Sequence, residues 1–523
     1  MITGRRGWVS CGGALLIGWG VCVEAQNITP GTPSSCSGRF PPVTCLEHGF
    51  SFNNGAADET TVLAPASIVG KLAGEAAGSQ VALAPDPQDA SSDDDAPLPG
   101  SKDELFGTEK GADAQGQKSS AVSFRGFLEN RTAYTYADPA HWSRAVTYVQ
   151  LGASGQSGDN LKWKVTARAD VDPVYIWSNF YNEAVKQDQR ANFLFEETYV
   201  DASLGNWDLR IGRQQIVWGE VVGLFVADVV SAQNQLEFIL PPFDIIRIPQ
   251  WAARGEYFFG DSHLELIWIP YPTYNNIGKP GADFYPVQTP PPAGYSQTFL
   301  GEVQPDRTLA NTNYGLRLST LKSGWDVSAF YYSSEDAAPT FIRNVVQTPT
   351  PTVVYQPVHD RIWQVGGTLG KAFGSVVFHA ETVYTSGREY EVTQLTQPNG
   401  VVPQNTLEYI VSVDFTLPKD LFLNVQLFQT IFFNHNPDLL YPAYGTGASV
   451  LLRGKLGPKL EPEILWIQGF NPSQNLIRPR LTWRPATNWR ASVGVDIFNG
   501  PITTQLGRFN DRDRVYAEVR FDF

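Results

Sequence analysis

Residues 515–523, the last nine of the chain, read V-Y-A-E-V-R-F-D-F and decide the fold. A β-strand turns alternate side chains to opposite faces. One face of this strand would carry only Val515, Ala517, Val519, Phe521 and Phe523. The other face would carry Tyr516, Glu518, Arg520 and Asp522. In a membrane barrel the apolar face lies against lipid and the charged face lines a wet lumen, so a barrel strand is predicted here.

The position of this strand adds to its pattern. A strand of a soluble sandwich can show the same alternation, but a chain rarely ends on such a strand with a terminal aromatic residue, here Phe523. The ending resembles the C-terminal signal that bacterial outer-membrane barrels present to their insertion machinery. The resemblance implies the outer membrane of a Gram-negative bacterium.

Segments of about ten alternating residues recur from about residue 121 onward. The clearest are 161–170 and 488–497, and 18 segments are counted in all, as follows: 123–136, 141–152, 161–170, 192–203, 206–216, 250–259, 262–270, 310–321, 325–333, 359–370, 374–386, 405–417, 421–433, 448–456, 460–469, 475–485, 488–497 and 514–523. The predicted fold is all-β, a transmembrane antiparallel β-barrel of about 18 strands, within a range of 16 to 20.

The connections between these segments alternate in length. Short ones include 204–206, 260–262, 322–324, 418–420 and 486–488. The long connections are 172–191, 217–249, 271–309, 334–358, 387–404, 434–447 and 500–512. Short periplasmic turns and long extracellular loops are typical of outer-membrane barrels, so both ends of the barrel are expected on the periplasmic side.

The N-terminal part reads differently from the barrel. Residues 1–25 have the basic start, apolar middle and small-residue end of a secretory signal. Residues 26–120 hold 13 acidic and 5 basic residues, a net charge of −8 out of −14 for the chain, and are rich in Ala, Gly, Pro and Ser. This leader is predicted to be mostly disordered in the periplasm, with a short helix within 62–83. It could bind a periplasmic partner or remain a solvated segment.

Cys36 and Cys45 remain after removal of the signal. In an oxidising periplasm they are predicted to form a disulfide, and the alternative is two free thiols. Beyond the N-terminus no run of 18 apolar residues occurs, so helical membrane spans are not predicted. Nothing in the charge pattern indicates nucleic-acid binding.

The most informative motif is L-R-I-G-R-Q-Q-I-V-W-G-E at 209–220, followed by an apolar connection that reaches residue 249. A loop exposed to water should not be so apolar, so the connection is expected to fold into the barrel or to present a binding surface. Residues 221–233 could form a helix. The charged residues and the tryptophan proposed for a constriction or plug are Arg213, Trp218, Glu220, Asp228, Asp244 and Arg247. A salt-bridge network that only anchors the loop is the alternative role.

The R-x-G-R-Q-x-x-x-W-G-E run and the loop after it resemble a family of proteobacterial outer-membrane barrels, the domain of unknown function thirteen-oh-two. The resemblance covers about 121–523 and is sharpest over 209–259. General porins resemble this stretch more loosely, through a loop folded inward between the fifth and sixth strands. The resemblance implies outer-membrane transport and leaves the cargo open, with hydrophobic compounds among the options.

Parity assigns a second set of residues to the lumen wall. These candidates are Lys162, Lys164, Arg168, Arg453, Arg478, Arg480, Arg484, Arg490 and Arg520. An arginine at the lipid midplane costs about 2–4 kcal/mol, so repeated arginine at one parity indicates water. Each one could conduct ions or only tie neighbouring strands together.

Signals for catalysis and for cofactors are weak. No metal, haem or phosphate-loop spacing occurs, so no cofactor is predicted. His379 and Glu381 share a parity and could serve an outer-membrane hydrolase with a serine from a neighbouring strand, a less favoured hypothesis.

The sequence is therefore consistent with four functions. The first is a porin-like channel for small solutes, narrowed or plugged by residues 217–249. The second is an outlet or uptake barrel for hydrophobic compounds or lipids that works with a periplasmic or inner-membrane transporter. A hydrolase and a sheath around a partner's redox chain are less favoured. The predicted partners are outer-membrane lipid, the transported compound and a periplasmic partner of the leader.

Overall fold

The computed structural model describes residues 80–81, 122–221, 223–286 and 290–523. The predicted signal at 1–25, the leader at 26–120 and the cysteines Cys36 and Cys45 lie outside the described residues, apart from Gln80 and Val81. Those two residues form the short strand β1, so this part of the predicted helix at 62–83 is extended.

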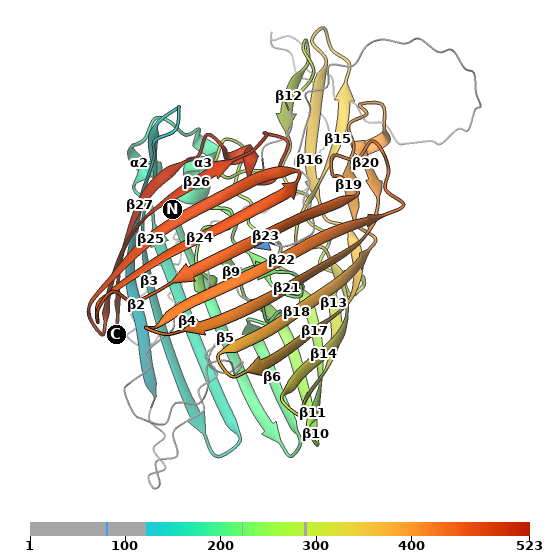
Figure 1. Ribbon diagram of the computed structural model, residues 1–523. Helices are drawn as coiled ribbons and strands as arrows, with labels where there is room; N and C mark the ends of the chain where they lie inside the picture. The colour runs from blue at the N-terminus through green and yellow to red at the C-terminus, as the bar shows by residue number, and fades with distance from the viewer. Residues whose placement is uncertain (1–79, 82–121, 222, 287–289) are drawn as a thin grey trace, which may run out of the picture. The chain divides into compact units, whose positions relative to one another are not determined.

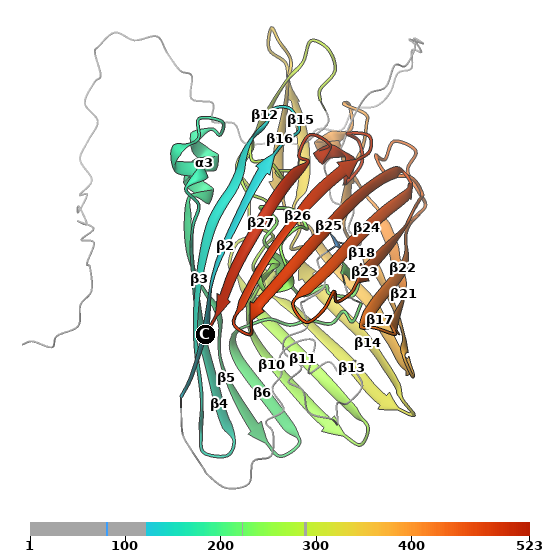
Figure 2. The same cartoon turned by 60° about the vertical axis from the view of Figure 1, so that its left-hand side comes forward.

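Eighteen antiparallel strands close into a barrel (Figure 1, Figure 2). They are β2 (Ser123–Thr135), β3 (His141–Ser157), β4 (Leu161–Val171), β5 (Ala191–Leu204), β6 (Trp207–Gln214), β10 (Gln250–Phe259), β11 (Ser262–Tyr271), β13 (Asn313–Lys322), β14 (Trp325–Glu335), β17 (Arg361–Phe373), β18 (Val376–Ser386), β21 (Asn405–Leu417), β22 (Leu421–Phe433), β23 (Tyr444–Arg453), β24 (Leu460–Asn471), β25 (Ser473–Ala486), β26 (Trp489–Asn499) and β27 (Arg514–Asp522). Each pairs with its neighbour along the chain, and β27 pairs with β2 to close the sheet. The predicted strand number is confirmed, and every predicted segment overlaps one of these strands.

The barrel has a turn side and a loop side. Connections at the turn side are tight, as at 205–206 between β5 and β6 and at 260–261 between β10 and β11. Loop-side connections are mostly long, as predicted, but two are short: 136–140 between β2 and β3, and Pro472 between β24 and β25. The alternation in length therefore holds for most of the barrel.

The outer surface of the barrel is apolar. On β27 the side chains of Val515 and Val519 are exposed, whereas Arg514 and Arg520 are buried inside. Aromatic residues cluster towards the strand ends, with Trp207, Trp325 and Trp489 near the turns and Trp251 and Trp268 towards the loops. Two aromatic girdles around an apolar band are the surface that a bilayer requires.

Small elements cover the loop side. Helices α2 (Val174–Trp177) and α3 (Glu183–Gln189) lie between β4 and β5. A three-stranded sheet of β12 (Ser296–Phe299), β16 (Thr352–Val358) and β15 (Thr340–Val346) extends beyond the barrel (Figure 1). A two-stranded sheet joins β19 (Glu389–Glu391) to β20 (Val401–Pro403). Within the described residues no helix has the length and apolarity of a membrane span.

Residues 215–249 connect β6 to β10 and fold into the barrel; they are called the inward loop below. The inward loop holds β7 (Leu224–Phe225), β8 (Ala232–Gln233), α4 (Phe243–Ile246) and β9 (Arg247–Ile248). Strand β7 pairs with β1, and β8 pairs with β9.

The prediction of a helix over 221–233 is wrong, since this stretch contains β7 and β8 and no helix among its described residues. The physical reason is that the amides of Val221 and Ala227 bond to a barrel carboxylate, Glu381, instead of to carbonyls of a helical turn.

Candidate functional site

Gly212 lies on β6, three residues before the inward loop begins. Its φ is 134°, and a Cβ there would lie 2.3 Å from the carbonyl oxygen of Thr198 on β5. Only glycine fits such a conformation at this close approach. The next buried residue, Gln214, donates from its amide to the carbonyl oxygen of Ala252 at 3.0 Å. The glycine of the R-x-G-R motif therefore lets β5 and β6 approach each other closely just before the chain leaves the barrel wall.

Trp218 packs against the wall formed by β11, β13 and β14. Its indole is fully buried, and its Nε1 donates to Glu265 Oε1 at 3.1 Å. The ring centroid lies 5.1 Å from that of Phe330. Gly315 makes room, because a Cβ there would lie 2.8 Å from the indole. The first arm of the inward loop is thus held by both an apolar pocket and a hydrogen bond.

Glu220 and Glu381 join the inward loop to the next strands of the wall. Arg317 on β13 and Thr368 on β17 donate to Glu220 Oε1 at 3.0 and 2.8 Å. The carboxylate of Glu381 on β18 accepts the amide of Glu220, and also the amides of Val221 at 2.7 Å and Ala227 at 2.8 Å. A buried carboxylate that accepts three amides is a strong anchor, since hydrogen bonds to charged groups are the strong ones.

Asp228 and Arg247 stabilise the inward loop internally. Arg247 Nε donates to Asp228 Oδ2 at 2.9 Å, and Ser231 Oγ donates to Asp228 Oδ1 at 3.1 Å. Both charged side chains are buried. A paired and hydrogen-bonded buried charge avoids the desolvation cost of a lone one, so this pair joins the outgoing and returning arms of the loop.

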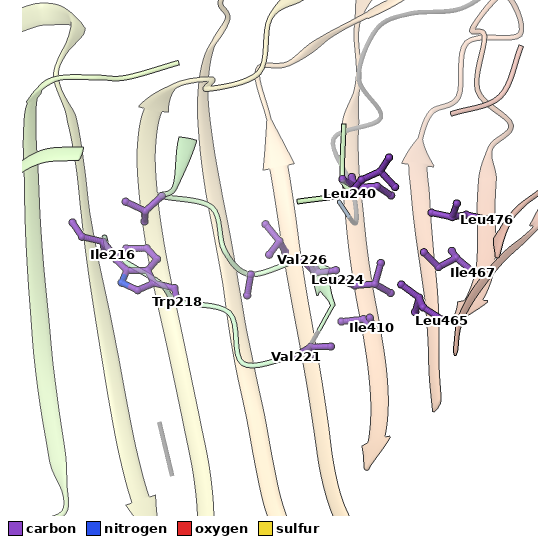
Figure 3. Packing of buried hydrophobic residues seen from close by; sticks show 14 of the residues in the cluster. Ile216, Trp218, Val221, Leu224, Val226, Leu240, Ile410, Leu465, Ile467 and Leu476 are labelled. Carbon is purple, nitrogen blue, oxygen red and sulfur yellow. The ribbon is translucent and has the colours of Figure 1, made fainter. Parts of the chain in front are cut away.

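The tip of the inward loop, residues 237–240, reaches the wall opposite Trp218. Ile239 and Leu240 belong to an apolar cluster that includes side chains of β21, β23, β24 and β25. Figure 3 shows the loop's apolar side chains crossing from Trp218 to Leu465 and Leu476. Arg478 on β25 donates to the carbonyl oxygen of Leu240 at 3.3 Å. The inward loop therefore contacts opposite sides of the lumen.

Glu237 fastens the tip to the wall on either side of the barrel closure. Arg514 Nη1 on β27 lies 2.8 Å from Glu237 Oε2, and Arg144 Nε on β3 lies 3.3 Å from Glu237 Oε1. Burial opposes ionisation of this carboxyl, but Arg144, Arg514 and Arg131 outweigh it and lower its pKa to about 2. Beside the tip lies a small cavity that these three arginines also line.

A family model described as a protein of unknown function (DUF1302) matches residues 134–523. The chain belongs to this family. The match covers most of the barrel, and the motif at 209–220 that suggested the family lies within it. No curated protein matches the chain.

Several solved outer-membrane structures are similar in part to this family member. OpdK of Pseudomonas aeruginosa is 9% identical over 77% of this chain and 99% of that chain, with a TM-score of 0.46. OccAB4 of Acinetobacter baumannii is 9% identical over 78% and 99%, with a TM-score of 0.45. OmpF of Salmonella typhi, in a complex with daunomycin, is 11% identical over 77% and 97%, with a TM-score of 0.38.

The residues proposed for a constriction fall into two groups in this DUF1302 protein. Trp218, Glu220, Asp228 and Arg247 lie in the inward loop with the partners given above. Arg213 lies on β6, outside the loop, and is half-buried. Asp244 lies in α4, and its side chain is outside the described part of the structure.

Most residues predicted for the lumen wall form ion pairs with acidic side chains. The pairs are Lys164–Glu197 at 2.8 Å, Arg168–Glu196 at 2.9 Å, Arg453–Glu463 at 3.9 Å, Arg478–Asp496 at 2.6 Å, Arg480–Glu463 at 3.1 Å, Arg484–Glu461 at 3.0 Å, Arg490–Glu129 at 4.0 Å and Arg520–Glu129 at 3.2 Å. Lys162 is exposed near the turn side. The arginines thus tie neighbouring strands together and also make the lumen wall polar.

Sequence reasoning missed the most central contacts of the tip. Glu237, Arg144 and Arg514 were not among the candidates, although Arg514 has the lumen parity of β27. Parity could have found Arg514, but no local signal pairs it with a loop residue 277 positions earlier.

Glu381 was considered only as part of a catalytic pair with His379. In the structure the carboxylate of Glu381 holds loop amides, and His379 Nε2 lies 3.8 Å from Asp414 Oδ2. Both side chains therefore have structural partners. Within the described residues, no group of three or more His, Cys, Asp or Glu side chains is arranged to hold a metal ion.

Proposed function

We propose that this protein is a transport channel of the Gram-negative outer membrane whose lumen is closed at rest by the inward loop. One observation carries the proposal: the loop is anchored on opposite walls, through Trp218 and Glu220 on one side and Glu237 and Leu240 on the other. A loop that followed one wall would narrow the pore without crossing it.

The barrel itself supports a channel. Barrels of 16 to 18 strands leave an aqueous passage unless something fills it. The lumen wall carries charged side chains, and the outer face is apolar with aromatic girdles. These features favour a membrane barrel with a polar interior, and the predicted secretory signal favours the outer membrane.

The first test is single-channel conductance in planar bilayers, comparing the full chain with a variant that lacks residues 221–246. We expect rare, brief openings in the full chain and steady current after the deletion. A matched control removes residues 346–351, an exposed segment at the β15–β16 hairpin outside the lumen. This control should behave like the full chain.

Two results would contradict the proposal. If the deletion variant is a folded barrel and carries no current, the inward loop is not what closes the lumen. If the full chain already passes steady current equal to that of the deletion variant, the loop lines an open pore instead of closing it.

A second candidate function is the passage of hydrophobic compounds together with a periplasmic partner. It is favoured by the apolar patch on the inner wall, where Ile410, Leu451, Leu465, Ile467 and Leu476 are all nearly inaccessible to solvent. A lumen that served only ions would have little use for such a patch. Extraction of lipid or hydrocarbon with the purified barrel would support this function, and unchanged envelope lipids in cells without the protein would argue against it.

A further inference from the structure

The tip of the inward loop combines a carboxylate with apolar side chains. Glu237 lies between Arg144 and Arg514, and Ile239 and Leu240 follow it in the apolar cluster. We propose that Arg144 and Arg514 form a binding site for the carboxylate of an amphipathic acid, and that Glu237 occupies this site at rest. Binding of such an acid would displace the tip and open the lumen, so this inference rests on the proposed function.

The arginine pair has the properties of an anion site. Both guanidinium groups are buried, and they come from strands on either side of β2. Each also has a carboxylate of its own on the wall: Asp172 at 3.4 Å from Arg144, and Asp496 at 2.8 Å from Arg514. The wall partners orient the two guanidinium groups towards the lumen, and they stay in place when the tip leaves. Arginine suits such a site because its planar donors match a carboxylate.

The surroundings of the pair favour an acid with a hydrocarbon body. Leu240 lines the same small cavity as Arg144, Arg514 and Arg131, and the rest of its polar lining includes Arg478, Tyr516 and Glu518. Beyond Leu240 lies the apolar patch with Leu465 and Leu476. A ligand that replaced both halves of the tip would place its carboxylate on the arginines and its chain on the patch. A small acid without a chain would replace only one half.

An added acid must compete with Glu237 for the two arginines, and this competition sets the concentration at which each acid should act. A tethered group competes at an effective concentration of the order of millimolar or above. Acetate should therefore act only in the range of about 10–100 mM. Hexanoate, which adds apolar surface that can be buried, should act at a concentration at least about tenfold lower.

The experiment measures current through the full chain in planar bilayers with acetate, hexanoate or hexanol added. We expect hexanoate to raise the open fraction about tenfold, acetate to do so only at the higher concentration, and hexanol to have no effect. Hexanol has the same hydrocarbon length without the charge, so an equal response to hexanol would show a bilayer effect and overturn the proposal. Equal potency of acetate and hexanoate would overturn the assignment of an amphipathic ligand.

Variants test the site directly. Glu237→Gln should open without ligand, with an open fraction about tenfold above that of the natural chain, and hexanoate should then change it less than twofold. Glu237→Asp keeps the charge and should retain the hexanoate response. Glu461→Gln is a matched control, because Glu461 also pairs with a wall arginine, Arg484, but does not line the tip cavity.

If Glu237→Gln does not fold, a second variant tests the proposal. Leu240→Ser weakens the hold of the tip without unpairing a buried charge, and it should lower the hexanoate concentration needed for opening. If the 221–246 deletion conducts but Glu237→Gln or Leu240→Ser behaves like the natural chain, this inference fails and the proposed function stands. If the deletion does not conduct, the proposed function fails first.

Discussion

The carboxylate of Glu381 holds the first arm of the inward loop at residues 220–227. The amides that it accepts belong to Glu220, Val221 and Ala227, so one side chain fixes the course of eight residues. The sequence shows Glu381 only as an acidic residue of lumen parity. Its role as an anchor depends on the inward loop, which packs against it.

Replacing Glu381 by glutamine should release this arm. The amide oxygen can still accept, but the NH₂ group faces loop N–H donors, and the charge is lost. Hydrogen bonds to charged groups contribute about 1.5–3 kcal/mol each, so we expect the open fraction in planar bilayers to rise at least about tenfold. Glu461→Gln serves as the control. Unaltered gating in a folded Glu381→Gln barrel would contradict this anchoring role.

The charge of Glu237 predicts how the closed state responds to pH. Because the pKa of Glu237 is lowered to about 2, its contribution to closure is complete above the ordinary value of 4.5 and is lost as the pH falls through about 2. The current through the full chain should therefore not rise with a midpoint near 4.5, the ordinary pKa of a glutamate. Opening with a midpoint near 4.5 would show that Arg144 and Arg514 do not hold this carboxylate.

Strand β27 carries the information that the chain ends in a membrane barrel. Its exposed valines face lipid, and its buried charges, Arg514 and Arg520, bind acidic groups inside the barrel. The same alternation recurs in the strands that precede it, because each strand of a barrel separates lipid from lumen.

Arginine substitutions on β27 test this two-sided pattern. Val519 lies near the middle of the strand and Val515 near its loop-side end. Val519→Arg should cost about 2–4 kcal/mol of folding free energy and Val515→Arg about 0–1 kcal/mol, because the cost depends on depth in the bilayer. Folded fractions in lipid vesicles over a urea gradient measure the difference. Equal costs would mean that β27 does not cross the bilayer at this depth.

The closed ladder of eighteen strands does not require the inward loop. Each strand has both neighbours, and β6 and β10 pair directly over Trp207–Gln214 and Gln250–Tyr257. A barrel without residues 221–246 should therefore still migrate as a compact species in cold detergent electrophoresis and shift only on heating. Loss of the compact species would show that the loop is needed for the barrel to form.

Local pattern was enough to predict the barrel. A period of two over about ten residues identifies a strand with one face in lipid, and it does so in every one of the eighteen segments because each strand meets the same two environments. The apolar composition of residues 217–249 predicted that this connection either folds into the barrel or presents a binding surface, and the structure shows that it folds into the barrel.

The anchors of the inward loop could not be predicted in this way. Val221 meets Glu381 across 160 positions of sequence, Leu240 meets Arg478 across 238, and Glu237 meets Arg514 across 277. No periodicity relates such distant residues; they meet because a closed barrel brings every strand around one lumen. The alternation of side chains along each strand therefore determined the barrel, whereas only its closure in three dimensions decided which wall residues hold the loop.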